Sequence, residues 1–255
     1  MRIEVIIPRR GINDDGLGKK HALHKLIAAS TADFVWLQDD DIIPPTLNNE
    51  LLSPLLSNTD LLILPLRMES NRPRPSLLER LQIAEYAAIQ QLTIVSAQHG
   101  RPVMCSGANL IVRRDRWIES YPELHNDIPS GDDMFLLESF KHRHLRITVA
   151  DTDALTATVR PITSWRQFLH QRMRWAGKAP HYTDSDIIRC GVLIASVNIL
   201  QLICPPILLI KFPIEYRLIK QRDPHVSFFI ALLLELLYPF YMLLSLIGGL
   251  FRKQW

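Results

Sequence analysis

Hydrophobic and polar positions divide the chain into two parts. Up to about residue 180, short apolar runs alternate with amphipathic stretches, and charged residues are frequent. Farther on, residues 190–210 contain no charged residue and residues 226–250 contain only Glu235. The pattern predicts a layered α/β domain over residues 1–180 and a membrane region over residues 181–255.

Within the first part, short apolar runs predict strands and periodic apolar positions predict helices. The expected strands are residues 2–7, 34–37, 60–66, 109–112 and 145–150. The expected helices are residues 21–30, 76–97, 132–142 and 164–178, the second opened by a capping box of Ser76 and Glu79 and the last by one of Ser164 and Gln167. This alternation predicts a largely parallel sheet, in which ligands bind beyond the carboxyl ends of the strands.

The two uncharged stretches, residues 190–210 and 226–250, are each long enough to cross a bilayer, which takes about 20 apolar residues. A pair of buried core helices is the alternative. Pro205-Pro206 predicts a kink or break, so the first stretch can also be re-entrant. Residues 211–225 between the two stretches mix apolar and basic side chains as an interfacial helix does.

The sequence leaves the orientation of these stretches ambiguous. Residues 1–10 carry no signal-peptide pattern. From the two uncharged stretches we expect a multi-pass protein of the cytoplasmic membrane, with the first part cytoplasmic. Two full crossings would place the basic segment 211–225 outside, against the positive-inside tendency. A shallow hairpin for the first stretch removes that conflict.

Composition excludes several classes of protein. Of the 255 residues, 47% are hydrophobic and 22% are charged, which excludes a disordered chain. The net charge of +3 is nearly balanced, which argues against a dedicated nucleic-acid binder. The three cysteines, Cys105, Cys190 and Cys204, form neither a disulfide framework nor a CxxC metal site.

The first candidate for chemistry is the acidic triplet Asp39-Asp40-Asp41, which directly follows the expected strand 34–37. Alternate residues of an extended chain point the same way, so Asp39 and Asp41 can face one ion. Carboxylate oxygens suit Mg²⁺ or Mn²⁺, particularly when phosphate oxygens complete the shell. The alternative is a solvated acidic turn.

The second candidate is the pair Asp132-Asp133, which follows Gly131 at an expected helix start. Acids at that place commonly stabilise the helix dipole. A carboxylate beside a metal site can also act as a general base toward an acceptor hydroxyl.

The third candidate is Gln171, Arg174 and Trp175, which share one helix face because they are spaced i, i+3 and i+4. Arg and Gln can bind phosphate, and Trp offers a stacking plane for a sugar ring. The alternative is a helix face that rests on the membrane surface. A fourth, weaker candidate is Gly18-Lys19-Lys20, which does not match a Walker A loop and leaves a phosphate-handling or a structural loop open.

The order of these motifs is more specific than any one of them. It runs through Gly18-Lys19-Lys20-His21-Ala22-Leu23, the acidic triplet with Pro44, Ser106-Gly107-Ala108-Asn109, Gly131-Asp132-Asp133 and Gln171-Arg172-Met173-Arg174-Trp175, with apolar segments last. The chain resembles the membrane-associated branch of the family 2 glycosyltransferases, which includes cellulose and hyaluronan synthases. The resemblance covers roughly residues 2–180.

The resemblance implies a GT-A fold and a hexosyltransferase-type, inverting transfer from a nucleotide sugar, with a UDP-sugar as donor and a glycan or lipid-linked hydroxyl as acceptor. It implies Mg²⁺ or Mn²⁺ on Asp39 and Asp41, membrane lipids as partners and no nucleic acid. Asp133 matches the catalytic base. The remaining matches are donor- or acceptor-binding residues: Gly107, Asn109, Asp132, Gln171, Arg174 and Trp175.

Two departures from the family pattern are visible. The later acidic pair is Asp-Asp where Glu-Asp is commoner. Residues 2–7 also match the family's third strand rather than its first, so we expect a GT-A sheet that is incomplete at its N-terminal side and binds nucleotide sugars poorly. The alternative function is accordingly an N-terminally truncated, non-catalytic membrane relative of such an enzyme.

Overall fold

The computed structural model describes residues 1–8, 18–128 and 130–251. The chain forms two compact units. Unit 1 comprises Met1–Leu66 and Thr93–Val159, and unit 2 comprises Arg67–Leu92 and Arg160–Trp255. Each unit is therefore built from two separate segments of the chain. The functional division expected at residue 180 stays a prediction.

Unit 1 is organised around a mixed sheet, which in the described residues has five strands. Their order across the sheet is β1 (Ile3–Ile6), β2 (Phe34–Gln38), β5 (Asn109–Arg113), β3 (Leu61–Ile63) and β6 (Ile147–Val149). β1 is parallel to β2 and β3 is parallel to β6, whereas β5 is antiparallel to both of its neighbours. The expected α/β sheet is confirmed, with the correction that its middle strand runs in the opposite direction.

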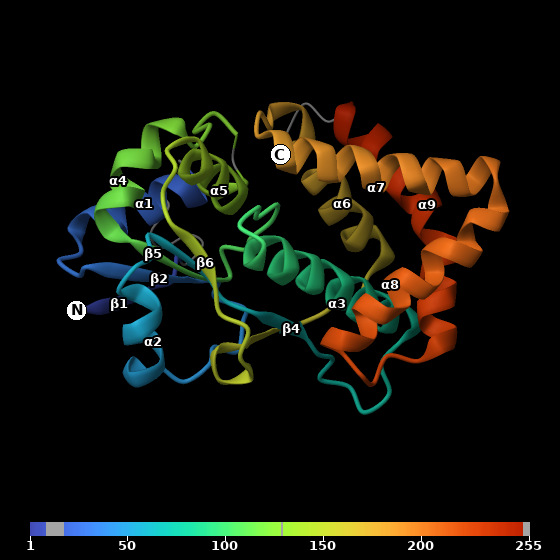
Figure 1. Ribbon diagram of the computed structural model, residues 1–255, viewed down its shortest axis with the longest axis horizontal. Coiled ribbons are helices and arrows are strands. Elements are labelled where there is room, and N and C mark those ends of the chain that lie inside the picture. Colours follow the sequence, from blue (N-terminus) through green and yellow to red (C-terminus); the bar gives the residue numbers. More distant parts are fainter. Residues whose placement is uncertain (9–17, 129, 252–255) are drawn as a thin grey trace. The chain divides into compact units, whose positions relative to one another are not determined.

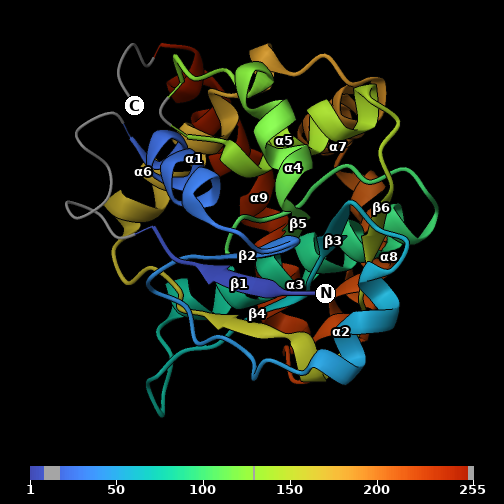
Figure 2. The same ribbon diagram turned by 90° about the vertical axis from the view of Figure 1, so that its left-hand side faces the viewer.

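Both faces of this sheet are covered, which explains why every residue of β2 is buried. Since alternate residues of a strand point to opposite faces, Phe34 and Trp36 share one face, where they pack with Leu52 and Leu56 of α2 (Asn49–Leu56). Helices α1 (Lys19–Ala29), α4 (Arg114–Ser120) and α5 (Asp132–His142) lie on the other face (Figure 1 and Figure 2).

The expected strand 60–66 is divided in two, β3 and β4 (Leu66–Met68). Pro65 lies at the division, where it has no N–H to donate to a ladder. β4 pairs with β7 (Ala157–Val159) in a separate two-stranded sheet. The short 3₁₀ helices η1 (Tyr121–Glu123) and η2 (Asp153–Leu155) complete the elements of this part of the chain.

Unit 2 is helical. The long helix α3 (Leu77–Gln98) begins in unit 2 and continues into unit 1, and the other helices are α6 (Trp165–Ala176), η3 (Ala179–His181), α7 (Ser185–Ile203), η4 (Pro205–Ile207), α8 (Leu208–Arg222) and α9 (Phe228–Leu250). The break expected at Pro205-Pro206 is confirmed, because α7 ends at Ile203. The segment expected to be interfacial forms α8.

Of the two expected capping boxes, one is confirmed. Glu79 Oε2 accepts the backbone N–H of Ser76 at 2.7 Å, and Ser76 Oγ accepts the N–H of Glu79 at 3.3 Å. Ser164 does precede α6 as predicted, but its side chain makes no capping hydrogen bond. The start of α6 therefore depends on contacts other than its own cap.

Two helices of unit 2, α7 and α9, are long and apolar enough to cross a membrane. One face of α9 packs against Leu81 and Ala84 of α3 and Ile219 of α8. Its opposite face exposes large apolar side chains along the whole helix, namely Phe228, Phe229, Leu236, Leu237, Phe240, Leu244, Ile247 and Leu250. Length and composition give weak support for membrane association and leave the number of crossings open.

Glu235, the single charged residue of segment 226–250, is buried in a polar cluster. The ammonium group of Lys211 in α8 lies 2.6 Å from Glu235 Oε2 in α9, and it donates to Asn198 Oδ1 at 2.9 Å and Gln201 Oε1 at 3.1 Å in α7. A charge buried in an apolar region needs such pairing. The cluster joins α7, α8 and α9.

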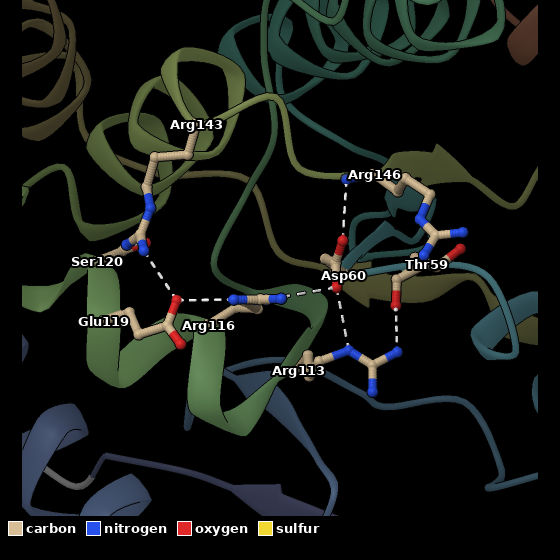
Figure 3. Close-up of polar contacts among 8 residues, drawn as sticks. All are labelled: Thr59, Asp60, Arg113, Arg116, Glu119, Ser120, Arg143 and Arg146. Atoms are coloured by element: carbon tan, nitrogen blue, oxygen red, sulfur yellow. Dashed lines mark hydrogen bonds and ion pairs between the residues drawn. The ribbon is translucent and has the colours of Figure 1, made fainter.

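A second ionic network holds the sheet edge where β5 ends and β3 begins (Figure 3). Asp60 accepts from Arg113 Nε at 3.0 Å and from the backbone N–H of Arg146 at 3.0 Å. Glu119 accepts from Arg116 Nη1 at 2.9 Å and from Arg143 Nη2 at 2.8 Å. Because these contacts join β3, β5, α4 and the segments flanking α5 and β6, we assign the network a structural role.

Candidate functional site

The candidate acids gather at the edge of the sheet where β1 and β2 end. Asp39 directly follows β2, and its carboxylate is half-exposed. Because β5 is antiparallel to β2, the start of β5 at Asn109 lies beside Gln38 at the same edge. This register brings the loop of Gly107 toward the acids. Asp40 and Asp41 are exposed.

The second acidic pair opens helix α5. Gly131 precedes the helix with a φ of 86°, a left-handed conformation that glycine adopts without steric cost. Asp132 is buried, whereas Asp133 is half-buried, and its Oδ1 accepts the backbone N–H of Met134 at 2.8 Å. Both acids therefore sit in the first turn, where the helix dipole stabilises negative charge.

Lys19 connects these two acidic segments. Its ammonium group lies 2.7 Å from Asp39 Oδ1 and 3.2 Å from Asp132 Oδ2. Burial by itself would lower the pKa of Lys19, but the nearby charges of Asp132, Asp39 and Asp133 outweigh it and raise that pKa above its ordinary value. Lys19 is therefore a fixed positive charge among the acids.

The neighbouring Lys20, by contrast, binds backbone oxygens. It is buried, and its ammonium group donates to the backbone oxygens of Leu124 and His125, at 2.5 and 2.8 Å. The sequence left open whether this loop handles phosphate or is structural, and the contacts of Lys20 are structural. Lys19 faces the candidate site.

Gly107 is close to the same group of side chains. Its backbone N–H donates to Asp133 Oδ2 at 3.3 Å. A Cβ atom added at Gly107 would lie 3.0 Å from Asp132 Oδ2 and 3.7 Å from Lys19 Nζ. The missing side chain thus lets the backbone approach the acids closely.

The side-chain amide of Asn109 forms hydrogen bonds within the fold through both its oxygen and its nitrogen. Its Oδ1 accepts from Trp36 Nε1 at 2.8 Å, and its Nδ2 donates to the backbone oxygens of Pro65 and Leu155, at 2.8 and 2.9 Å. Since the amide is buried and these bonds use its main capacity, its visible contribution is to hold the start of β5. A contact of this amide with an acceptor stays a prediction.

Cys105 lies beside the acids but is unsuited to act as a nucleophile. The thiol donates to the backbone oxygen of Asp133 at 3.3 Å. Burial, followed by the charges of Asp133 and Asp132, raises the pKa of the Cys105 thiol well above its ordinary value. The reactive thiolate form is therefore disfavoured. All three cysteines, which belong to the described residues, are free.

The third group of expected site residues lies in unit 2, on α6. Trp175 and Arg174 are exposed and Gln171 is half-buried. Between them is Arg172, which sequence reasoning passed over and which is buried. Its Nη1 donates to Gln171 Oε1 at 2.7 Å, and its guanidinium lies 4.3 Å from the centre of a Trp175 ring. Only the burial of Arg172 reveals its role, and a sequence gives no direct sign of that burial.

The side chains of this site can supply only some of the ligands that a divalent ion needs. Over the described ranges, no three His, Cys, Asp or Glu side chains come together as a metal-holding group. Mg²⁺ needs few protein ligands when a diphosphate supplies the others, so Asp39 and Asp41 suffice as carboxylate donors. Lys19 already contacts Asp39, so an ion there would share that carboxylate or displace the ammonium group.

Comparison with family profiles matches residues 2–178 to the glycosyltransferase-like family 2. The match covers well over half of the chain, and the chain belongs to this family. The mixed α/β unit with its acidic edge is accordingly of the GT-A type that the motif order implied. A search of curated proteins gave no match.

Two solved structures are similar to parts of the chain. A mycobacterial protein is 17% identical with a TM-score of 0.36, over 71% of this chain and 65% of that one. Residues 1–349 of S. aureus TarS are 14% identical with a TM-score of 0.37, over 91% of this chain and 68% of that one. The chain thus spans about two thirds of the length of each.

Proposed function

We propose that the protein transfers a sugar, a hexose in the simplest case, from a nucleotide diphosphate to a hydroxyl acceptor with inversion at the anomeric carbon. The observation that supports this most is the meeting of Asp39, Asp132 and Lys19 at the edge where β2 ends. Such an edge is where ligands bind in open α/β sheets. Family membership makes the donor a nucleotide sugar, with UDP as the proposed nucleotide.

Asp133 is the proposed general base. Its half-buried carboxylate has one oxygen bound to the N–H of Met134 and the other to the N–H of Gly107, so its orientation is fixed. As the acceptor oxygen bonds to the anomeric carbon, the hydroxyl proton passes to Asp133, and the bond from that carbon to the diphosphate breaks. The diphosphate leaves with the bonding electrons.

Negative charge grows on the leaving diphosphate, and positive groups that meet it there lower the barrier. We assign this role to Arg174, with Gln171 as a hydrogen-bond donor and Trp175 as a stacking plane. A Mg²⁺ or Mn²⁺ ion bound by Asp39 and Asp41 would add positive charge at the diphosphate. Lys19 keeps Asp39 and Asp132 in place before the donor arrives.

The membrane is the proposed place of action. The exposed apolar side chains of α7 and α9 would enter lipid and carry the enzyme to a glycan or lipid-linked acceptor. Multi-pass crossing is the expectation from length, but the packing of α9 favours a shallow insertion. Phe168 of α6 contacts Tyr241 at 5.5 Å between ring centres, and a Cβ at Gly249 would come within 2.7 Å of Gly177. A crossing α9 would therefore take the Arg-rich α6 with it, which is costly.

The test is sugar transfer by the detergent-solubilised full chain, with radiolabelled UDP-sugars and membrane lipid extract as acceptor. Transfer that depends on Asp133 supports the proposal. A folded protein that neither transfers sugar nor hydrolyses any UDP-sugar, with or without Mn²⁺, favours the non-catalytic relative. Sedimentation of the chain without detergent tests the membrane part, since a chain that stays in the supernatant is not membrane-attached.

A further inference from the structure

A buried ion pair joins α6, which carries the proposed diphosphate motif, to α3. Arg172 of α6 donates through Nε to Glu85 Oε1 of α3 at 3.1 Å and through Nη2 to Glu85 Oε2. Both residues are almost fully buried, with exposed fractions of 6% and 4%. Two parallel hydrogen bonds to one carboxylate fix the plane of the guanidinium as well as its place.

The guanidinium of Arg172 stays charged at ordinary pH values. Burial lowers the pKa of Arg172, but the attraction of Glu85 and their hydrogen bonds outweigh burial and leave the pKa raised. Removing one partner would leave the other charge buried without compensation, which is strongly unfavourable. The pair is therefore a rigid connection from α3 to the middle of α6.

The third donor of Arg172 determines which way the Gln171 amide faces. A guanidinium carries only donors, so the Gln171 atom that lies 2.7 Å from Nη1 has to be the oxygen Oε1. The amide nitrogen Nε2 then points away from Arg172. Nε2 has no hydrogen-bond partner within the described residues, so its two N–H groups are open to a ligand.

Arg172 also covers one face of an aromatic ring of the motif. Its guanidinium lies 4.3 Å from the centre of the Trp175 ring and 4.6 Å from that of Phe168. Arginine stacks well on such rings. Trp175 is nevertheless 37% exposed, so ring surface remains for a ligand.

A second contact from α3 supports the entry into α6. Gln82 lies one turn before Glu85, donates through Nε2 to the backbone oxygen of Ile162 at 2.7 Å, and accepts the N–H of Ile162 at 3.0 Å. Since Ser164 supplies no capping bond, α3 holds α6 both at its entry and at its middle.

We infer that Arg172, held by Glu85, is the positioning residue of the α6 motif, fixing Gln171 as a hydrogen-bond donor and orienting Trp175. With Arg174, the motif then offers its ligand N–H donors and an aromatic face. This set suits a group that carries acceptor oxygens beside a sugar ring, and in that respect the inference rests on the proposed function. Arg172 itself acts through its neighbours.

The experiment uses the full chain in detergent, with folding checked by circular dichroism. Glu85→Gln keeps the shape and removes the charge, and Arg172→Lys keeps the charge and removes the fork. Arg166→Gln is the matched control, an exposed arginine on the same helix. Acrylamide quenching of tryptophan fluorescence is measured for each, with Trp175→Phe in every background to isolate the Trp175 component.

Both pair variants should raise the quenching constant of Trp175 about twofold, and the control should leave it unchanged. UDP binding with Mn²⁺ is then titrated. Gln171→Ala should weaken it about tenfold in the parent, the cost of one hydrogen bond to a charged group, and less than twofold in the Glu85→Gln background. Such coupling is what a positioning role requires.

Unchanged quenching in both pair variants would overturn the inference, and so would equal effects of Gln171→Ala in the two backgrounds. If the parent binds no UDP, the nucleotide assignment fails. The quenching result then still decides whether Arg172 orients the motif.

Discussion

Lys19 Nζ lies 2.7 Å from Asp39 Oδ1, although Lys19 begins helix α1 and Asp39 follows strand β2. The same ammonium group reaches Asp132 at 3.2 Å. Three chain segments in which the sequence predicted site residues are therefore joined by one cation. Without Lys19 these carboxylates would repel one another.

The first prediction follows from this contact. Lys19→Met should lower the stability of the protein by about 1–3 kcal/mol, since it removes the ammonium group that lies beside the buried carboxylate of Asp132. A change of that size lowers Tm by roughly 2–4 °C for each kcal/mol. Millimolar Mg²⁺ or Mn²⁺ should restore part of the loss, because a divalent ion can replace the missing charge. Thermal unfolding with and without EDTA measures both effects.

The same contact has a defined pH dependence. The pKa of Lys19 is raised in the folded state, so its contribution is fully present below the unfolded lysine value of about 10.4 and is lost only above it. The difference in Tm between parent and Lys19→Met should thus stay constant from pH 6 to pH 9. A difference that disappears in this range would mean that Lys19 is not the partner of the acids.

The second prediction concerns the base. Asp133→Asn should reduce turnover by roughly 10²-fold or more, a typical effect of removing a general base. It should leave donor binding nearly unchanged, because the donor contacts are assigned to Arg174, Gln171 and the metal-binding acids and not to Asp133. Asp115→Asn is a suitable control, since Asp115 is exposed and forms an ion pair with Arg114 away from the candidate acids. Equal turnover of Asp133→Asn and the parent would remove the assignment.

The third prediction uses the capping box of α3. The backbone N–H of Ser76 is the main cause that lowers the pKa of Glu79 below its ordinary value. Its contribution is therefore present above the unfolded value of about 4.3 and is lost as pH falls through the lowered pKa. Glu79→Gln should cost about 0.3–1 kcal/mol at pH 7 and progressively less below pH 5.

Urea unfolding at several pH values measures this difference. The exposed Glu69, replaced by Gln, serves as the control from the same segment. A constant difference between Glu79→Gln and the parent down to pH 3 would show that the carboxylate charge adds nothing to the cap.

The fourth prediction tests how α7 enters the membrane. Cys204 is exposed directly after α7, whereas Cys105 is buried. The experiment treats a Cys190→Ser variant with a membrane-impermeant maleimide. If α7 is part of a shallow hairpin, Cys204 is not labelled in intact cells. In permeabilised cells it is labelled only if it lies at the level of the lipid headgroups. We expect no labelling from outside, since the basic α8 disfavours an outer location. Labelling of intact cells would establish a crossing.

Much of the local structure follows from the sequence alone. Apolar periodicity predicted α5 at its observed bounds and α3 and α6 within a few residues, because a buried helix face repeats with the helical period. The nearly uncharged stretch 226–250 predicted α9 within a few residues. Pro205-Pro206 marked the end of α7, since proline lacks the N–H that a helix continues with. The motif order predicted the glycosyltransferase family, which the family match confirms.

Which side chains meet depends instead on how the chain folds in three dimensions. The reversed direction of β5 depends on pairing between strands about 70 residues apart, for which periodicity holds no information. From the sequence, Lys19 was an ambiguous loop residue and Arg172 lay between two motif positions without a role of its own. In the structure, each is the centre of a charged cluster. Their roles come from carboxylates 20 to 113 positions away, Asp39 and Asp132 for Lys19 and Glu85 for Arg172. Such charges attract one another only after folding has brought them together and has excluded most of the water between them.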